Sequence, residues 1–249
     1  MISNDRKAVV VGGSNGIGLA ICKALVQRGY YIEICDCAQP EEGVLATDSY
    51  SYHYSNLLDF DEDAFESLAS DQSVELLMVT AGIGRIADFQ FHHTAEIEKM
   101  LTIDTVSTMK IFRIFYDRIL SDKPFYTGVM GSISGWMSTP SASVYAAAKA
   151  AVVRFVESVN IELEAYGSPN RILDISPASF KGSKFYGGKN DLAITGALAA
   201  EILEHLFVRE TRFIPQYKET FKAVLERYHN DPHEYGLHSF KYKHESGRL

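Results

Sequence analysis

The stretch Val11-Gly12-Gly13-Ser14-Asn15-Gly16-Ile17-Gly18 decides the fold. An apolar, β-branched run precedes it at 7–12, and apolar side chains recur at the helical period over 16–28. A glycine-rich turn between a strand and a helix, at the start of a βαβ unit, is typical of a phosphate-binding turn. Glycine lets the backbone approach a diphosphate, and the helix N-terminus offers unpaired N–H groups and a partial positive charge. A glycine turn without a ligand is the alternative. The expected binding residues of the turn are Gly12, Ser14, Asn15, Gly16, Ile17 and Gly18.

Apolar runs alternate with amphipathic stretches along the rest of the chain. Further strands are expected at 31–35, 50–54, 74–79, 125–131, 171–176 and 213–215. Helices are expected at 61–69, 95–120, 143–166, 192–208 and 219–228. Strands that are apolar on both faces and alternate with helices indicate a parallel sheet covered on both sides. We predict an α/β fold, a Rossmann-like doubly wound parallel sheet of about seven strands with helices on both faces, forming a single domain over 1–249.

Composition narrows the possible partners. The chain has 249 residues, of which 46% are hydrophobic and 22% charged, which excludes disordered, collagen-like and coiled-coil chains. A net charge of −8 argues against a nucleic-acid partner. The polar N-terminus and the absence of a long apolar run favour a cytoplasmic protein with no membrane segment. The spacing of Cys22, Cys35 and Cys37 fits neither a zinc site nor a disulfide framework, so no metal is expected.

Asp36 stands at the end of the second expected strand, roughly twenty residues beyond the glycines. A carboxylate there can accept hydrogen bonds from an adenosine ribose and repels a 2′-phosphate. No lysine or arginine lies within 12–18 or at Cys37 to bind that phosphate. The sequence therefore favours NAD over NADP as the cofactor. A solvated charge at the strand end is the alternative for Asp36.

A tyrosine and a lysine stand four residues apart in Tyr145-Ala146-Ala147-Ala148-Lys149, so they share one face of a helix. An adjacent ammonium favours the phenolate, so we expect Lys149 to lower the pKa of Tyr145 toward neutrality. Upstream, Ser132 ends an expected strand, where its hydroxyl can hydrogen-bond a substrate carbonyl. Together these residues predict a catalytic group of Ser132, Tyr145 and Lys149.

These motifs resemble the short-chain dehydrogenase/reductase family over residues 5–215. The resemblance rests on the glycine turn, Asn56-Leu57, Ala81-Gly82, Ser132, Tyr145 with Lys149, and Ser176-Pro177. It implies a tyrosine general acid/base, a lysine that also holds the nicotinamide ribose, and a serine that orients the carbonyl. It further implies that Asn56 faces the adenine amine and Pro177 the nicotinamide carboxamide. Leu57, Ala81 and Gly82 are expected to complete the cofactor site.

Four positions depart from the family pattern. Val11 and Ala178 replace a threonine and a glycine, which we interpret as mild changes. Thr80 replaces an asparagine and retains a hydrogen-bonding group. The family's helical asparagine, which completes a proton relay, corresponds here to Asp104. A carboxylate there either holds the relay water beside Lys149, as a fourth catalytic residue, or faces solvent and leaves the relay incomplete.

The C-terminal third of the chain is expected to determine which substrate the protein accepts. The family resemblance implies that 178–208 covers the substrate, and this segment contains Lys181, Lys184 and Lys189. It is too polar for a steroid or long acyl pocket, so we expect a small polar carbonyl or polyol, a phosphorylated sugar among them. A solvated lid without such a role is the alternative. The tail, 227–249, interleaves basic and aromatic residues and is expected to dock on its own domain or on a neighbouring subunit. The family resemblance implies a homodimer or homotetramer that pairs the two long helices.

The sequence therefore predicts an enzyme that moves a hydride between NAD and a secondary alcohol or ketone. A nucleotide-sugar epimerase or dehydratase uses a similar group of residues but needs a larger C-terminal region. A redox-sensing protein that binds NAD without turnover is a third reading, although such a protein has no need of Ser132, Tyr145 and Lys149 together.

Overall fold

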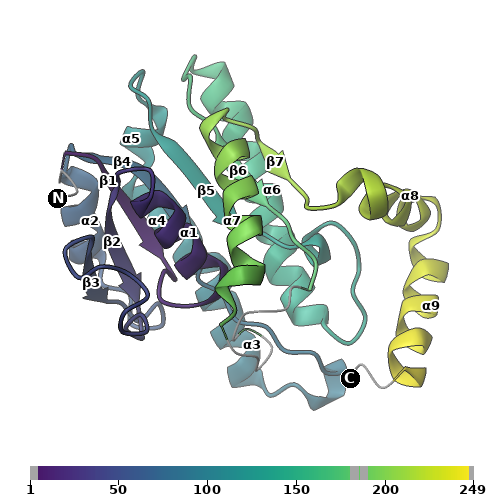
Figure 1. Ribbon diagram of the computed structural model, residues 1–249. Helices are drawn as coiled ribbons and strands as arrows, with labels where there is room; N and C mark the ends of the chain where they lie inside the picture. The colour runs from purple at the N-terminus through teal and green to yellow at the C-terminus, as the bar shows by residue number, and fades with distance from the viewer. Residues whose placement is uncertain (1–4, 180–184, 186–189, 247–249) are drawn as a thin grey trace.

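The computed structural model describes residues 5–179, 185 and 190–246. Seven parallel strands form one sheet in the order β3-β2-β1-β4-β5-β6-β7 (Figure 1). Their bounds are β1 Lys7–Val11, β2 Tyr31–Asp36, β3 Tyr50–Tyr54, β4 Val74–Val79, β5 Tyr126–Met130, β6 Ile172–Ile175 and β7 Arg212–Phe213. The predicted doubly wound parallel sheet is confirmed.

Helices cover both faces of the sheet. The helices of the α/β body are α1 Gly16–Val26, α2 Glu62–Ser70, α3 Thr94–Leu101, α4 Ser107–Ile114, α5 Tyr116–Leu120, α6 Ser143–Ala165 and α7 Leu192–Phe207. Ala8 and Val10 of β1 face one core, which α1 and α7 close, and these two helices lie side by side (Figure 1). Val9 and Val11 point the opposite way, into a core that α2, α4 and α6 close. Successive side chains of a strand alternate between faces, so the apolar run of β1 supplies both cores.

The sheet order reverses beside β1, and this reversal positions the site. The chain runs outward from β1 to β3 on one side and from β4 to β7 on the other. In the ladders, Val11 at the end of β1 pairs with Cys35 of β2 and with Val79 of β4, so these strands end at the same edge. Loops that leave this edge in opposite directions open a crevice, which is where ligands bind in folds of this kind.

The expected helix over 95–120 is wrong as a single element. A π-helical segment, Thr102–Val106, separates α3 from α4, and the chain breaks again at Phe115 before α5. A π-helical turn carries an extra residue per turn, so it rotates one side chain out of the regular apolar stripe. The side chain affected here is Asp104, which is buried.

The C-terminal region forms two helices that project from the α/β body (Figure 1). A π-helical turn, Tyr217–Phe221, leads into α8, Lys222–Asn230, which corresponds to the expected helix over 219–228. The last helix, α9, Pro232–Glu245, was not anticipated. The sequence does contain a signal for the start of α9: Asp231 accepts from the Glu234 N–H as the N-cap, and a proline occupies the first turn.

Within the described part of the chain, no helix is long and apolar enough to cross a membrane.

Candidate active site

The glycine-rich turn between β1 and α1 leaves no space for a side chain on its inner face. Gly12 has a φ of +84°, and a Cβ there would lie 2.5 Å from the backbone nitrogen of Ala81. A Cβ on Gly18 would lie 2.2 Å from the carbonyl oxygen of Gly12. Because no carbon atom tolerates such contacts, glycine is required at both positions. Glycine therefore lets this turn pack directly against the turn after β4 and against the start of α1.

The N-terminus of α1 offers hydrogen-bond donors. Asn15 makes no side-chain cap there, and the Gly16 N–H donates instead to Oδ1 of Asn190, 2.9 Å away. The hydroxyl of Ser14 is buried and has no hydrogen-bond partner among the described residues. The unpartnered Ser14 hydroxyl and the positive end of the helix suit an anion such as a phosphate.

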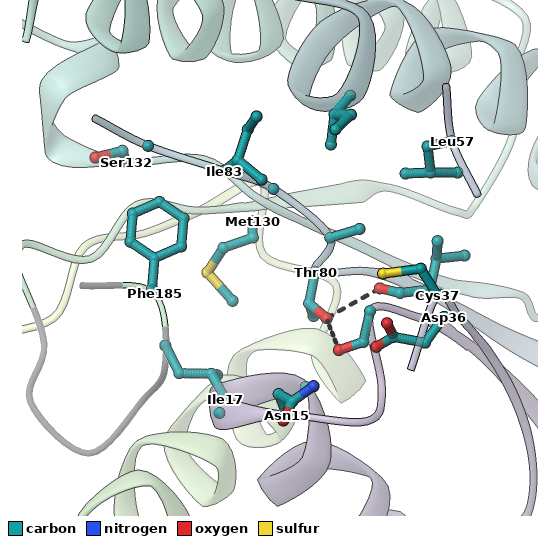
Figure 2. A pocket seen from close by; sticks show the side chains of 18 of the residues that line it. Asn15, Ile17, Asp36, Cys37, Leu57, Thr80, Ile83, Met130, Ser132 and Phe185 are labelled. Carbon is teal, nitrogen blue, oxygen red and sulfur yellow. Dashed lines mark hydrogen bonds between the residues drawn. The ribbon is translucent and has the colours of Figure 1, made fainter. Parts of the chain in front are cut away.

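Asp36 ends β2 directly beside this turn. Its Oδ2 accepts from the Ser14 N–H at 3.0 Å, and its Oδ1 accepts from the Ala38 N–H at 3.2 Å. Figure 2 shows Asp36 close to Cys37 at one end of the cavity. The carboxylate is therefore held in place by backbone donors at the end predicted to receive an adenosine ribose.

Two further turns, one after β4 and one after β3, lie at the same edge of the sheet as the glycine-rich turn. Thr80, after β4, donates from Oγ1 to the carbonyl oxygens of Val11 at 2.9 Å and Gly12 at 3.1 Å (Figure 2). The threonine therefore links its turn to the phosphate-binding turn. After β3, Oδ1 of Asn56 accepts from the Leu58 N–H at 3.1 Å, so that oxygen already serves the local turn.

A cavity of about 470 Å³ connects these turns to the start of α6. The predicted residues that line it are Gly12, Asn15, Gly16, Ile17, Gly18, Asp36, Asn56, Leu57, Ala81, Gly82, Ser132, Tyr145, Lys149 and Pro177. Ser14 and Asp104 lie behind its surface. Lining residues that sequence reasoning missed include Cys37, Ser55, Ile83, Gly84, Met130 and Phe185. All of these except Phe185 lie at, or shortly after, the carboxyl end of a strand, and that position is the signal that would have found them.

Ser132, Tyr145 and Lys149 meet at the other end of the cavity from Asp36. Ser132 follows β5, and its hydroxyl accepts from the Ser134 N–H at 3.1 Å. Tyr145 lies in the first turn of α6, and Lys149 lies one turn further along the same helix. The ammonium of Lys149 donates to the carbonyl oxygen of Met130 at 3.0 Å and lies 5.8 Å from the centre of the Tyr145 ring.

Asp104 lies behind Lys149, so of the two alternatives left open by the sequence the solvent-facing side chain is excluded. Only 1% of the residue is exposed. Its Oδ1 accepts from the Ile83 N–H at 2.7 Å, while Oδ2 lies 3.5 Å from Nζ of Lys149 and has no hydrogen-bond partner within the part of the chain that the structure describes. Burial raises the pKa of Asp104, and Lys149 and the Ile83 N–H oppose that rise.

The pKa of Tyr145 does not move in the direction expected from the sequence. The pKa of Tyr145 is raised to about 12, mainly because the phenol is buried; the Ser132 side chain lowers it and the charge of Asp104 raises it, both by less than burial does. The expected lowering by Lys149 is therefore wrong in this structure. Lys149 is itself balanced by the Asp104 carboxylate, which reduces its effect on the phenol.

The C-terminal third of the chain, 178–249, contains the expected substrate-covering segment and the tail. Lys181, Lys184 and Lys189, on which the expectation of a polar substrate rests, are outside the described residues. In the tail, Nζ of Lys243 donates to the carbonyl oxygen of Pro140 at 2.6 Å, and His244 lies 3.2 Å from the carboxylate of Asp88. The tail thus docks on its own domain, which is one of the two expected arrangements.

Comparisons with known sequences identify a family and distant relatives. The family model described as short chain dehydrogenase matches residues 6–185. A protein named dehydrogenase RED2 from Cochliobolus heterostrophus is 27% identical over 158 residues, which cover 62% of this chain and 60% of the relative. A very-long-chain 3-oxoacyl-CoA reductase from Pyricularia oryzae is 26% identical over 173 residues, which cover 64% of this chain and 52% of the relative. The chain therefore spans between half and two thirds of the length of these relatives.

Solved structures share the fold. A short-chain dehydrogenase/reductase from Burkholderia phymatum in complex with NAD superposes with a TM-score of 0.78 at 18% identity, covering 93% of this chain and 95% of that one. A short-chain dehydrogenase from Sphingobium yanoikuyae in complex with NADPH gives a TM-score of 0.72 at 20% identity, covering 91% of this chain and 96% of that one. At these identities the likeness concerns the fold alone.

Proposed function

The chain belongs to the short-chain dehydrogenase family, and from this premise we propose that it moves a hydride between a nicotinamide dinucleotide and a secondary alcohol or ketone. The proposal rests on a single cavity whose two ends are lined by different kinds of residues. The glycine turn and Asp36 line one end, and Ser132, Tyr145 and Lys149 line the other. An extended dinucleotide that begins at the first end would bring its far ring to the second.

The residues of the cavity fit such a cofactor. The bare backbone at Gly12 and Gly18 and the donors at the start of α1 suit its diphosphate. We assign the adenosine ribose to Asp36, the adenine to Asn56 and Leu57, and the nicotinamide end to Lys149 and Pro177, with Ala81 and Gly82 as the wall between. When bound, the nicotinamide supplies the carbon that gives or accepts the hydride.

In this mechanism Tyr145 holds the proton at its phenolic oxygen. A pKa of about 12 keeps the phenol protonated at neutral pH, which suits donation to the oxygen of a carbonyl substrate. The Ser132 hydroxyl would donate a hydrogen bond to the same substrate oxygen as negative charge develops there. Lys149 and the buried carboxylate of Asp104 would supply the path by which Tyr145 recovers its proton.

The first experiment measures binding and turnover separately. Isothermal titration with NAD and NADP tests the cofactor, and a panel of ketones and secondary alcohols followed at the nicotinamide absorbance tests the reaction. We expect Tyr145→Phe to lower kcat by about 10²–10⁴-fold with an unchanged Kd for the cofactor. Turnover that survives this substitution would exclude the proposed acid. Cofactor binding without turnover on any substrate would instead support an NAD-sensing protein.

We propose NAD as the preferred cofactor because Asp36 places a negative charge where NADP carries its 2′-phosphate. Asp36→Ala should weaken NAD binding and improve NADP binding, so that the ratio of the two Kd values moves toward one. Glu42→Ala, which removes an exposed carboxylate from the following loop, is the matched control. A wild-type preference for NADP would overturn the assignment.

Other expectations from the sequence stay predictions. These are a covering role for 178–208, a cytoplasmic location and assembly into a homodimer or homotetramer. The expected small polar substrate, such as a phosphorylated sugar or polyol, also stays a prediction, and it is the alternative to the apolar substrate class inferred below.

A further inference from the structure

The walls around Tyr145 come from several separate segments of the chain. Ile83 and Gly84 follow β4, Met130 ends β5, Ala178 follows β6, and Phe185 comes from the segment before α7. Figure 2 shows Phe185, Ile83 and Met130 around the same end of the cavity as Ser132. These walls are apolar.

The ring of Phe185 packs against Tyr145. The rings of Phe185 and Tyr145 lie 5.7 Å apart between centroids and are tilted by 58°. A Cβ on Gly84 would lie 2.8 Å from two atoms of the Phe185 ring, so the ring rests directly on this glycine. An aromatic side chain thus packs against the bare backbone of one wall and against the proposed catalytic phenol.

The layer behind these walls is apolar as well. Met100, Ala142 and Val144 are buried around Tyr145, and Ile83, Ile97 and Phe185 pack against them. A polar substrate that entered here would lose hydration along its skeleton without gaining partners from this layer.

Among the described lining residues, the polar side chains at this end are those of Ser132, Tyr145 and Lys149. The ammonium of Lys149 already serves the Met130 carbonyl oxygen and faces Asp104. An ammonium has three N–H donors, and the third is the one assigned above to the nicotinamide end of the cofactor, so none remains for a phosphate on a substrate. Ser132 and Tyr145 suffice for one reacting oxygen, and the other described lining residues at this end leave the rest of the substrate in apolar surroundings.

We propose that this end of the cavity selects a ketone or secondary alcohol with an apolar, aliphatic or aromatic skeleton, and that Phe185 sets the size accepted. This rests on the proposed function. The balance of the reaction is unchanged: reduction of the ketone forms one C–H bond from the hydride of the reduced cofactor and one O–H bond from Tyr145.

The experiment compares matched substrates with saturating NADH. A methyl ketone series from 2-butanone to 2-octanone varies apolar area alone, while dihydroxyacetone and dihydroxyacetone phosphate represent polar and phosphorylated carbonyls. We expect kcat/KM to rise by about fourfold for each added methylene until the pocket is filled. We expect both polar ketones to react at least tenfold more slowly than 2-hexanone.

Two variants assign the effect to Phe185. Phe185→Ala should extend the rise in kcat/KM to longer ketones and lower it for the short ones, while Phe185→Leu retains most of the wild-type profile. Gly84→Ala, which pushes against the ring, should reduce kcat/KM for every ketone. Lys241→Ala, on the exposed face of α9, should leave the profile unchanged.

A second readout avoids turnover by using the Tyr145→Phe variant. In the presence of NAD⁺, 2-hexanol should raise the Tm of this variant more than glycerol or glycerol 3-phosphate does at equal concentration. A higher kcat/KM for dihydroxyacetone phosphate than for 2-hexanone would overturn the inference and support the lysines of 181–189 as phosphate ligands. Failure of the proposed function looks different, because no dinucleotide would bind or no carbonyl of either class would react.

Discussion

Asp104 is a buried carboxylate at a position where the pattern of the short-chain dehydrogenase family has an asparagine. Its Oδ1 serves the Ile83 N–H, and its other oxygen faces Lys149. Its charge raises the pKa of Tyr145. Asp104 is therefore placed to control both the lysine and the phenol without lining the cavity.

We expect Asp104→Asn to keep at least a tenth of the activity, because the amide oxygen can still accept from Ile83. Removing the charge should lower the pKa of Tyr145, so the pH profile of kcat/KM for alcohol oxidation should shift to lower pH. Profiles measured on the wild type and the variant test this. A near-total loss of activity would show that the negative charge itself is required. Asp104→Ala is the companion variant, because it also leaves the Ile83 N–H without an acceptor.

Asp174 is a second buried carboxylate, beneath the turn that carries Ser132. Its Oδ1 accepts from the Ser176 hydroxyl at 2.8 Å, and a Cβ on Gly131 would lie 2.1 Å from the same oxygen. Burial raises the pKa of Asp174 to about 6, against lowering by Ser176, Trp136, Arg212 and Lys149. The carboxyl therefore binds a proton more tightly in the folded protein than in the unfolded chain, whose value is 3.8.

Because the folded pKa is the higher one, this group makes the protein less stable as pH rises from about 4 through about 6. A shift of this size corresponds to about 3 kcal/mol of unfolding free energy. Asp174→Asn should remove that loss, so its stability relative to the wild type should improve between pH 4.5 and pH 8. Urea unfolding at the two pH values measures this. Asp59→Asn, at an exposed position, is the control, and an equal change in both variants would contradict the burial argument.

At the scale of elements, the π-helical segment places Asp104 behind the cavity, and α9 joins the loops after β4 and β5. The segment Thr102–Val106 turns Asp104 inward between α3 and α4. α9 reaches back to the loop after β5 through Lys243 and Pro140, and to the loop after β4 through His244 and Asp88. Asp88 also accepts from the Ser141 hydroxyl at 2.6 Å, so the two loops and the helix are joined.

We expect Lys243→Ala to weaken the docking of α9, because the half-buried ammonium loses its bond to the Pro140 carbonyl oxygen. A hydrogen bond from a charged group contributes about 1.5–3 kcal/mol, and each kcal/mol corresponds to about 2–4 °C in Tm for a chain of this size. Thermal unfolding followed by circular dichroism checks the decrease. Lys241→Ala removes an exposed lysine from the same helix and should leave Tm unchanged. Equal Tm values for the two variants would mean that the contact contributes nothing.

At the scale of the whole molecule, the outer surface of the helical layer retains apolar side chains. Val106 beside α4 is 45% exposed, and Ile161 on α6 is 65% exposed. These residues lie in the two segments that were expected to pair between subunits.

We expect light scattering to give a mass of at least twice the 27.8 kDa of one chain. Ile161→Asp should lower that mass, because a carboxylate at a buried interface loses its hydration. Glu157→Gln, a polar substitution one turn earlier on α6, is the control. A wild-type mass of one chain at micromolar concentration would contradict the predicted assembly.

The sequence by itself determined the layers of the sheet, the glycine-rich turn between β1 and α1, and the spacing of Tyr145 and Lys149. These features follow from local rules: alternation along a strand, the helical period, and the space that only glycine leaves. Only the tertiary structure decided the burial of Asp104 and Asp174, the direction of the pKa of Tyr145 and the apolar walls beside Phe185. These depend on groups that come together from distant segments and exclude water, and no local pattern records which side chains will lose their hydration.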